Sequence, residues 1–347
     1  MTMSRTRPHV RFQDPSIELA HGAGGKASRR LIEGLIAPYV FESGTELRDV
    51  AEVALAGGRL AMTADAFVVK PRVFPGGSIG ELAVNGTAND LAMGGARPLA
   101  LVATLILEAG LPTEELEREM AAMARAAERA GVAIVGGDTK VVEHGKADGL
   151  YITTAGIGLV DPRVDLSAKR VRPGDQVLLS GPIGDHGITI LLARGEIELE
   201  AELTSDTRPL WPLVEALIEA AAPGLRWLRD PTRGGVATAL NELARDARVT
   251  VVLDDEAIPV RPEVRGACEI LGLDPLHIAN EGQFLAVVAP EYADAALEAL
   301  RRVPGGAPAV RIGAIEEGTR PVVLARSRYG GTRVIDMLVG DPLPRIC

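Results

Sequence analysis

Short apolar runs alternate with amphipathic stretches in the first half of the chain. Runs rich in apolar and β-branched residues predict strands at residues 60–69, 99–107, 132–135 and 151–160. Ser78 suits the N-cap of a helix that runs towards Met93, and Thr113 suits the N-cap of a second helix. Acidic residues in the first turn and Gly131 at the end support that second helix. The pattern therefore predicts one α+β unit over about residues 17–165.

A charged, turn-rich connection over residues 161–175 leads into a second alternation of strands and helices. Strands are predicted at residues 176–180, 249–253, 284–289, 310–315 and 321–326. Helices are predicted near residues 210–221, 235–246, 261–271 and 292–302. We therefore expect an α+β chain with two α/β-type domains, divided into an N-terminal extension at residues 1–16, an N-terminal domain at 17–165, a C-terminal domain at 166–336 and a tail at 337–347.

The composition limits the classes of protein to consider. With 347 residues and 47% hydrophobic content, the chain can bury a core large enough for two domains. A formal net charge of −10 argues against nucleic acid as the main partner. No apolar run approaches the ~18 residues of a membrane span, and the first residues lack the apolar stretch of a signal peptide. We therefore expect a cytoplasmic protein with no membrane partner. Its two cysteines need no disulfide framework, and Cys268 suits a buried helix position.

Three acidic positions are expected where strands give way to turns or helices. They are Asp65, Asp90 with its neighbour Asn89, and Asp138 in a glycine-flanked segment. Carboxylates that converge from separate elements are hard oxygen ligands suited to Mg²⁺, which in turn suits phosphates. For any one of these residues, the alternative is an ordinary turn or cap residue.

Two glycine-rich loops are candidates for phosphate binding. Residues 230–236 lead into a helix and offer backbone N–H groups, the Thr232 hydroxyl and the Arg233 guanidinium. Residues 21–26 combine three glycines with Lys26, but Ala20 replaces the first glycine of a Walker A loop. The second loop matches the dinucleotide fingerprint only weakly, because the preceding strand is poor. We interpret it as a loop that closes over a nucleotide phosphate, with a plain linker as the alternative.

The chain ends in a cysteine on a proline-containing tail. Pro342 and Pro344 favour an extended shape over residues 341–347, which span at most roughly 20 Å. Such an arm can carry the thiol of Cys347 into a cleft, where the thiolate would be the nucleophile. The alternative is a frayed end that happens to finish in cysteine.

Together these segments resemble the ATP-dependent enzymes related to aminoimidazole ribotide synthetase. Within that superfamily they resemble the HypE family of hydrogenase maturation proteins, the carbamoyl dehydratases. The internal motifs indicate the superfamily and the terminal cysteine indicates the family. They lie at residues 21–26, 85–92, 136–141, 230–235, 280–282 and 344–347.

The resemblance implies a two-domain fold whose N-terminal sheets pair in a homodimer, with ATP and Mg²⁺ between subunits and domains and a flexible C-terminal tail. It implies that Cys347 receives a carbamoyl group from the carbamoyltransferase HypF. ATP then activates the thiocarboxamide for dehydration to a thiocyanate. The cyano group passes through the HypC–HypD complex to the iron of a [NiFe] hydrogenase.

The resemblance also implies roles for individual residues. The metal ligands would be Asp65, Asp90 and Asp138, which together with Lys26, Asn89, Thr232 and Arg233 would hold the nucleotide. Besides Cys347, the catalytic candidates are Glu281 as a base and Lys140 as a group that orients the thiocarboxamide; the alternatives are a turn Glu and a surface Lys. Two other functions stay open: a related ATP-dependent enzyme acting on a small free substrate, and a non-enzymatic thiol carrier.

Overall fold

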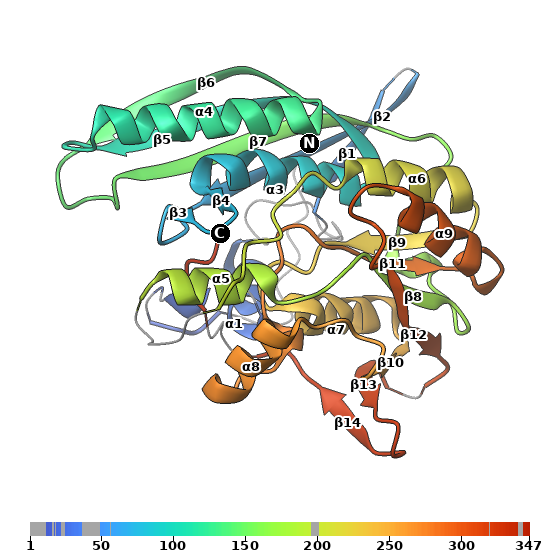
Figure 1. The fold of residues 1–347 in the computed structure, drawn as a ribbon. Helices are drawn as coiled ribbons and strands as arrows, with labels where there is room; N and C mark the ends of the chain where they lie inside the picture. The colour runs from blue at the N-terminus through green and yellow to red at the C-terminus, as the bar shows by residue number, and fades with distance from the viewer. Residues whose placement is uncertain are drawn as a thin grey trace.

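The computed structural model describes two α/β units stacked on each other (Figure 1). The described residues are 12–15, 17, 19–21, 25–36, 49–55, 57–195, 201–318, 320–338 and 343–347. Most of the predicted N-terminal extension, and the glycines of residues 22–24, lie outside them. In Figure 1 the N-terminal unit lies above and the C-terminal unit below, with the end of the chain between them.

The N-terminal unit is built on a five-stranded sheet in the order β1-β2-β7-β5-β6. Its strands are β1 (Ala51–Leu55), β2 (Gly58–Phe67), β7 (Leu150–Val160), β5 (Ala96–Glu108) and β6 (Ala133–Val142). Neighbouring strands are antiparallel except β5 and β6, which are parallel. A parallel pair needs a crossover, and α4 (Thr113–Ala130) provides it. The helices α3 (Ile79–Met93) and α4 lie on one face of the sheet (Figure 1).

The helix boundaries in this unit follow the predicted signals in part. Gly131 ends α4 in the left-handed conformation at φ +64°, as expected of a C-cap glycine. Thr113 is the first residue of α4 and Pro112 occupies the N-cap, so the prediction of Thr113 as the cap was wrong by one position. Ser78 does occupy the N-cap of α3, but its side chain makes no capping hydrogen bond.

The C-terminal unit contains a seven-stranded mixed sheet in the order β14-β13-β10-β12-β8-β11-β9. Its strands are β8 (Gln176–Leu179), β9 (Leu225–Arg229), β10 (Thr250–Asp254), β11 (Leu285–Val288), β12 (Val310–Glu316), β13 (Val322–Arg326) and β14 (Thr332–Ile335). Its helices are α5 (Asp185–Ala193), α6 (Trp211–Ala221), α7 (Gly235–Ala247), α8 (Pro262–Leu271) and α9 (Pro290–Arg302). Cys268 is buried in α8, as the sequence predicts, and burial raises the pKa of its thiol to about 11.

Short elements complete the described chain. They are η1 (Leu19–His21), α1 (Gly25–Leu31), the π-helical turn η2 (Ile32–Ile36), the strands β3 (Val73–Phe74) and β4 (Gly77–Ser78), and the 3₁₀ turns η3 (Ala168–Arg170) and η4 (Pro275–His277).

The two units share their hydrophobic cores. Leu91 and Met93 of α3 lie in one buried cluster with Leu217 of α6 and Phe284 beside β11. A second buried cluster joins Ile79 and Leu82 of α3 to residues of α5, α8 and the tail. Because buried apolar surface is the main stabilising term, each unit contributes to the stability of the other. The junction between them is therefore a fixed scaffold on which a site can be built.

Candidate active site

An acidic cluster lies at the junction between the two units. Its members are Asp49 just before β1, Asp90 on α3 and Asp230 just after β9, and their carboxylate oxygens lie within 4.8 Å of one another. The Thr63 hydroxyl on β2 donates a hydrogen bond of 2.9 Å to Asp90. Three separate elements thus bring hard oxygen ligands to one point, which is the donor set that Mg²⁺ prefers.

The electrostatics of this cluster fit a bound cation. Burial raises the pKa of Asp90 well above its usual range, and the neighbouring carboxylates of Asp65, Asp230 and Asp49 raise it further. Burial and then Asp49 raise the pKa of Asp230 to about 7. Carboxylates crowded in this way repel one another, and a divalent cation between them relieves that repulsion.

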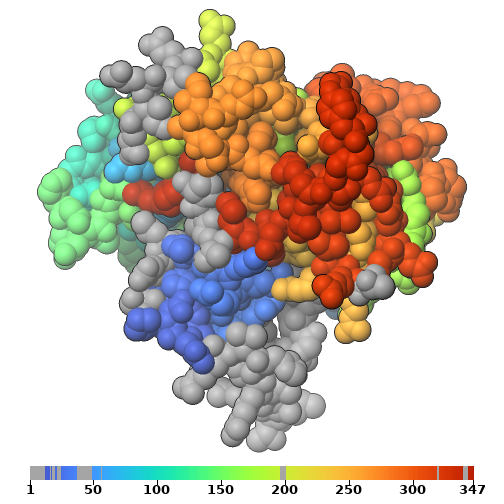
Figure 2. Space-filling model, turned by 90° about the horizontal axis from the view of Figure 1, so that it is seen from below, coloured from blue at the N-terminus to red at the C-terminus, as the bar shows by residue number. Residues whose placement is uncertain are grey.

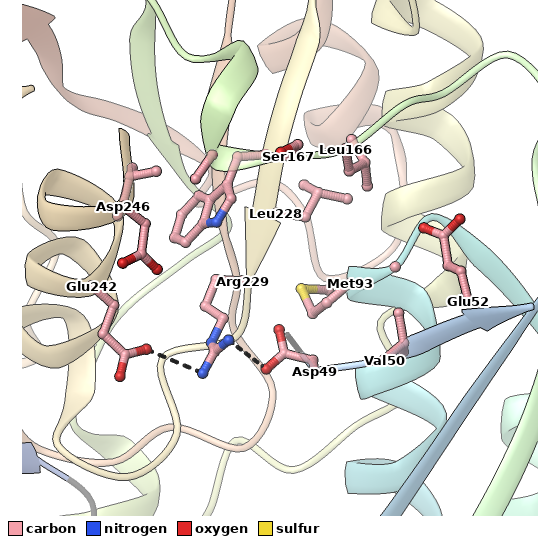
Figure 3. Close-up of a pocket in the computed structure, with 14 residues that line it drawn as sticks. Asp49, Val50, Glu52, Met93, Leu166, Ser167, Leu228, Arg229, Glu242 and Asp246 are labelled. Carbon is pink, nitrogen blue, oxygen red and sulfur yellow. Dashed lines mark hydrogen bonds and ion pairs between the residues drawn. The ribbon is translucent and has the colours of Figure 1, made fainter. Parts of the chain in front are cut away.

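One edge of the cluster is already neutralised by an arginine. Arg229 on β9 pairs with Asp49 at 2.7 Å and with Glu242 of α7 at 3.3 Å (Figure 3). These residues line a small pocket of about 60 Å³ at the junction. Asp49 therefore has a fixed ion-pair partner within the protein, and the charge of Arg229 also acts on Asp230.

Asp65 lies beside the cluster, on the inner face of β2. Thr63, Asp65 and Phe67 are on the side of the strand that faces α3, and the Asp65 carboxylate lies near Gly86 of that helix. Burial raises the pKa of Asp65, and Arg233 opposes this shift. Asp65 lies within the predicted strand, as β2 confirms, but not where a strand gives way to a turn, because β2 continues to residue 67. Asp65 and Asp90 come from separate elements and interact electrostatically, in agreement with the predicted convergence of these two carboxylates.

Asp138 does not join the cluster within one chain. It lies inside β6, not in the predicted turn, and pairs with the exposed Lys140. Hydrogen bonds from Lys140 and the Thr139 amide hold the pKa of Asp138 below its usual value. Asp138 is three strands away from β2, or about 14 Å at the usual spacing of neighbouring strands. Together with residues of β5 and α4 it borders a hollow of about 510 Å³.

The C-terminal tail enters the same junction. In Figure 1 the end of the chain lies between the β3–β4 hairpin and α5. The amide of Val68 donates to the terminal oxygen of Cys347 at 3.0 Å, and the amide of Lys70 donates to the carbonyl of Arg345 at 3.2 Å. Leu343 and Ile346 are buried. The last five residues are therefore docked against the protein, with Leu343 and Ile346 buried and the other three half-buried.

Arg233 links the tail to the acidic cluster. Negative charge at Cys347 is the largest cause of the raised pKa of the Arg233 guanidinium, followed by Asp65 and Glu281. Arg233 precedes the start of α7, where Gly234 and Gly235 have positive φ values of 75° and 62°. Few other residues adopt that conformation, so the two glycines set the sharp turn that presents Arg233.

Glu281 is a buried carboxylate that interacts electrostatically with Arg233. Its amide and that of Gly282 donate to Asp206 at 3.0 and 3.1 Å. A Cβ at Gly282 would lie 1.7 Å from the Asp206 carbonyl oxygen, so this approach requires glycine. Burial raises the pKa of Glu281 well above its usual range, and Asp230 and Asp206 add to the shift. The positive charge of Arg233 opposes this shift.

The other predicted site residues lie in different surroundings. Lys26 pairs with Asp336 at 2.6 Å, and its amide donates to Leu338. Figure 2 shows α1 and η2, in blue, against the red C-terminal segment on this face. Thr232 is half-buried in the loop before α7. Lys140 is exposed on β6, where it pairs with Asp138.

Asn89 joins the two units. Its amide group donates to the carbonyls of Arg208 and Glu281 at 3.0 and 3.3 Å, and its oxygen accepts from the Leu210 amide at 2.8 Å. The structure thus uses Asn89, which the sequence proposed as a nucleotide ligand, as a buried bridge between domains.

Sequence reasoning missed several residues of this junction. Asp230 opens the loop already singled out for phosphate binding, so its position before that loop was an available signal. Asp49 and Asp206 stand in no recognisable motif, and only the fold brings them to the site. The same holds for His186 and Arg194, which contact the tail.

The chain matches two family models over most of its length. Residues 48–160 match the N-terminal domain of AIR synthase related proteins, and residues 172–326 match their C-terminal domain. Among the helices of the described residues, none has both the length and the apolar character needed to cross a membrane.

Similar proteins cover nearly the whole chain. Carbamoyl dehydratase HypE of Azotobacter vinelandii is 50% identical over 97% of this chain and 98% of its own. Carbamoyl dehydratase HypE of Rhodobacter capsulatus is 51% identical over 97% of this chain and 99% of its own.

Solved structures give the same result. A crystal structure of the hydrogenase maturation protein HypE in complex with ATP is 45% identical, with a TM-score of 0.80 over 96% of this chain and 100% of that one. A HypE–HypF complex is 42% identical, with a TM-score of 0.83 over 89% and 99% of the two chains. A thiamine-phosphate kinase complex, at 22% identity and a TM-score of 0.67, shares the fold.

Proposed function

The chain belongs to the HypE family of carbamoyl dehydratases, which act in hydrogenase maturation, and from this premise we propose that it dehydrates a thiocarboxamide carried on its own Cys347. The observation that carries the proposal is the docked tail. Charge at Cys347 acts on Arg233, which also interacts electrostatically with Asp65 and Glu281 of the junction. A substrate attached to the protein reaches the site without a bimolecular encounter, which is a large kinetic advantage.

The reaction removes the oxygen of an amide, which is a poor leaving group. Transfer of the γ-phosphoryl group of ATP to that oxygen, with release of ADP, turns it into a good one. Loss of phosphate and of the remaining nitrogen-bound protons then leaves a carbon–nitrogen triple bond on sulfur. The balance is thiocarboxamide plus ATP giving thiocyanate, ADP, phosphate and a proton.

We propose that the acidic cluster holds Mg²⁺ and the nucleotide phosphates. Asp65, Asp90 and Asp230 would be the ligands, with Asp49 held in place by Arg229. The ion would neutralise charge on the phosphates. Arg233 and Thr232, at the start of α7, would bind phosphate oxygens, as would Lys26 after exchanging its Asp336 partner.

Glu281 is the proposed base for the nitrogen-bound protons. It is buried, and it interacts electrostatically with Arg233, as the tail residue Cys347 does. Burial raises its pKa, and a raised pKa favours uptake of a proton by the ionised carboxylate. A cation bound at the adjacent carboxylates would favour that ionised form.

The protein would act as a homodimer through its N-terminal sheet. The face of this sheet opposite α3 and α4 exposes large apolar side chains, with Met62 of β2 at 45%, Val102 of β5 at 43% and Leu159 of β7 at 51%. Exposed apolar area of this kind is typical of protein interfaces. Asp138 and Lys140 stand on the exposed β6, where they could serve the site of a second copy. We further propose HypF as carbamoyl donor, the HypC–HypD complex as acceptor and the cytoplasm as location.

Intact-mass measurement of Cys347 tests this function. The full chain is incubated with HypF, carbamoyl phosphate, ATP and Mg²⁺, and we expect a carbamoyl adduct that loses one water only when ATP is present. The variant Cys347→Ala should fold and bind nucleotide but carry no adduct, because the terminal thiol contributes little to the core.

Two results would contradict the proposal. ATP turnover on a small free substrate without any adduct on the tail would indicate a different enzyme of the superfamily. A stable carbamoyl adduct that never loses water would indicate a thiol carrier.

A further inference from the structure

We propose that Arg194 and His186 are positioning residues that hold the C-terminal tail by its backbone oxygens and so set the depth at which the Cys347 thiol lies. This inference rests on the proposed function, since it concerns the delivery of the tail-bound substrate. His186 belongs to α5, a helix of the C-terminal unit, and Arg194 directly follows that helix.

Every backbone oxygen from Pro344 to Cys347 accepts a hydrogen bond from the protein. Arg194 donates to the carbonyls of Pro344 and Arg345, His186 is bonded to that of Ile346 at 2.8 Å, and Val68 donates to Cys347. Such a continuous set is typical of a bound peptide strand and not of a frayed end. The contacts fix the register of the tail, because a slip of one residue would break all of them.

Arg194 connects the tail to the N-terminal unit. Its Nε donates to the Lys70 carbonyl at 3.0 Å, and a terminal nitrogen of the same guanidinium donates to the Arg345 carbonyl at 3.1 Å. The planar guanidinium presents its donors in a fixed fork, so both bonds are made in one geometry. Arg194 therefore fixes the tail relative to the segment that follows β2.

His186 holds the next carbonyl from inside the core. The ring is completely buried, its Nδ1 lies 2.8 Å from the Ser205 hydroxyl, and the Phe74 ring packs edge-on against it at 5.7 Å. Burial keeps the imidazole neutral, with its pKa lowered to about 4. A neutral ring has one donor, so Nε2–H donates to the Ile346 carbonyl and Nδ1 accepts from Ser205.

The side chains of the tail also contact the protein, in addition to the hydrogen bonds to its backbone. Leu343 and Ile346 are buried at 4% and 2% exposure, and Arg345 forms an ion pair with Asp148 of the N-terminal unit. Ile346 immediately precedes Cys347. The burial of its side chain and the His186 hydrogen bond to its carbonyl therefore hold the same residue of the tail. Because elements of both units hold the tail, the position of the thiol depends on how the units are packed.

The test measures how well the tail is held in the full-length protein. We would follow alkylation of Cys347 by iodoacetamide, read by peptide mass, in Arg194→Ala and in the matched control Arg172→Ala. Arg172 also donates to two backbone carbonyls, but these belong to Lys169 and Val171 and not to the described residues of the tail. Alkylation of the buried Cys268 reports general unfolding in the same sample.

We expect Cys347 alkylation to rise about tenfold in Arg194→Ala and to stay within about twofold of the parent in Arg172→Ala, because the charged hydrogen bonds of Arg194 hold the docked state. On carbamoylated protein, Arg194→Ala should lower the dehydration rate by about tenfold with the KM for ATP unchanged. His186→Gln, which keeps a side-chain donor, should give a smaller increase in alkylation.

Unchanged Cys347 alkylation in Arg194→Ala would overturn the inference, and so would equal increases at Cys347 and Cys268. Alkylation does not depend on catalysis, so this result is separate from the fate of the proposed function. If Cys347 of the parent protein is protected from alkylation but no thiocyanate forms, the proposed function is refuted, whereas the inference that Arg194 and His186 hold the tail still stands.

Discussion

Aspartate carboxyl groups have opposite environments at the junction between the domains and on the edge strand β6. At the junction, burial and neighbouring carboxylates raise the pKa values of Asp90 and Asp230. On β6, Asp138 is exposed and its pKa is lowered by Lys140 and a backbone amide. At the junction the carboxylates repel one another, and a bound cation can relieve that repulsion. On β6 the charge of Asp138 is already neutralised by Lys140. The comparison teaches that acidic residues in similar sequence contexts acquire their roles from burial and neighbours.

Asp90→Asn should have the largest effect on activity. We expect Mg²⁺-dependent ATP turnover to fall by about 10²-fold or more, because the amide lacks the charge that a hard divalent ion requires. Its oxygen can still accept from Thr63, and the loss of a crowded buried carboxyl should raise the unfolding temperature. Steady-state kinetics and thermal unfolding check both parts. A variant that loses activity and also stability would mean that Asp90 is structural.

A residue appended after Cys347 should block the reaction while leaving ATP binding intact. The terminal oxygen of Cys347 already accepts from Val68, and reacting groups tolerate errors of only about 1 Å before rates fall by roughly 10²-fold. Single-turnover dehydration of the carbamoylated, extended chain checks this, with nucleotide binding as the control. Dehydration at the parental rate would show that the terminal position of Cys347 is incidental.

Asp138→Asn tests whether the exposed strand serves a second copy. Alone it should lower Mg²⁺-dependent ATP turnover. A heterodimer of Asp90→Asn and Asp138→Asn chains, isolated with two affinity tags, should retain about half of the parental activity if each site combines Asp90 of one chain with Asp138 of the other. An inactive heterodimer would place both residues in the site of the same chain. Parental activity in the single variant Asp138→Asn would remove it from the site.

The pH dependence of stability should separate the two regions. The pKa of Asp230 is raised from 3.8 to about 7, so the folded state binds more protons between those values and stability falls as pH rises through this window. The effect is on the order of a few kcal/mol. The pKa of Asp138 is lowered, so any stability it adds is present above its ordinary pKa and is lost as pH falls.

Unfolding temperatures measured from pH 5 to 8, with Mg²⁺ and with a chelator, check this prediction. Without Mg²⁺ the unfolding temperature should decline with rising pH, and Asp230→Asn should flatten the decline. The matched variant Asp138→Asn should leave the profile in this range unchanged. A flat profile for the parent protein would mean that the cluster carries less repulsion than its geometry indicates.

Local patterns in the sequence were sufficient for most regular elements. The strands and helices of both units, the C-cap at Gly131 and the buried Cys268 follow from periodicity and cap residues. Asp90 was correctly placed on a helix, and the described end of the tail is docked by backbone hydrogen bonds to residues that follow β2. The sequence missed β1, β9, β14 and α5, since these are short or lack a cap signal.

Tertiary structure decided which residues meet. Asp49, Asp90 and Asp230 are separated by many residues along the chain, and only the packing of β1, α3 and β9 brings their carboxylates together. The order of strands in the N-terminal sheet carries Asp138 away from Asp65, although both follow similar apolar runs. The hydrogen bonds from His186 and Arg194 to the tail also join distant segments; Arg194 and Pro344, for example, are 150 residues apart. Local propensities set the elements, whereas contacts between distant segments depend on burying a shared core, which no local pattern records.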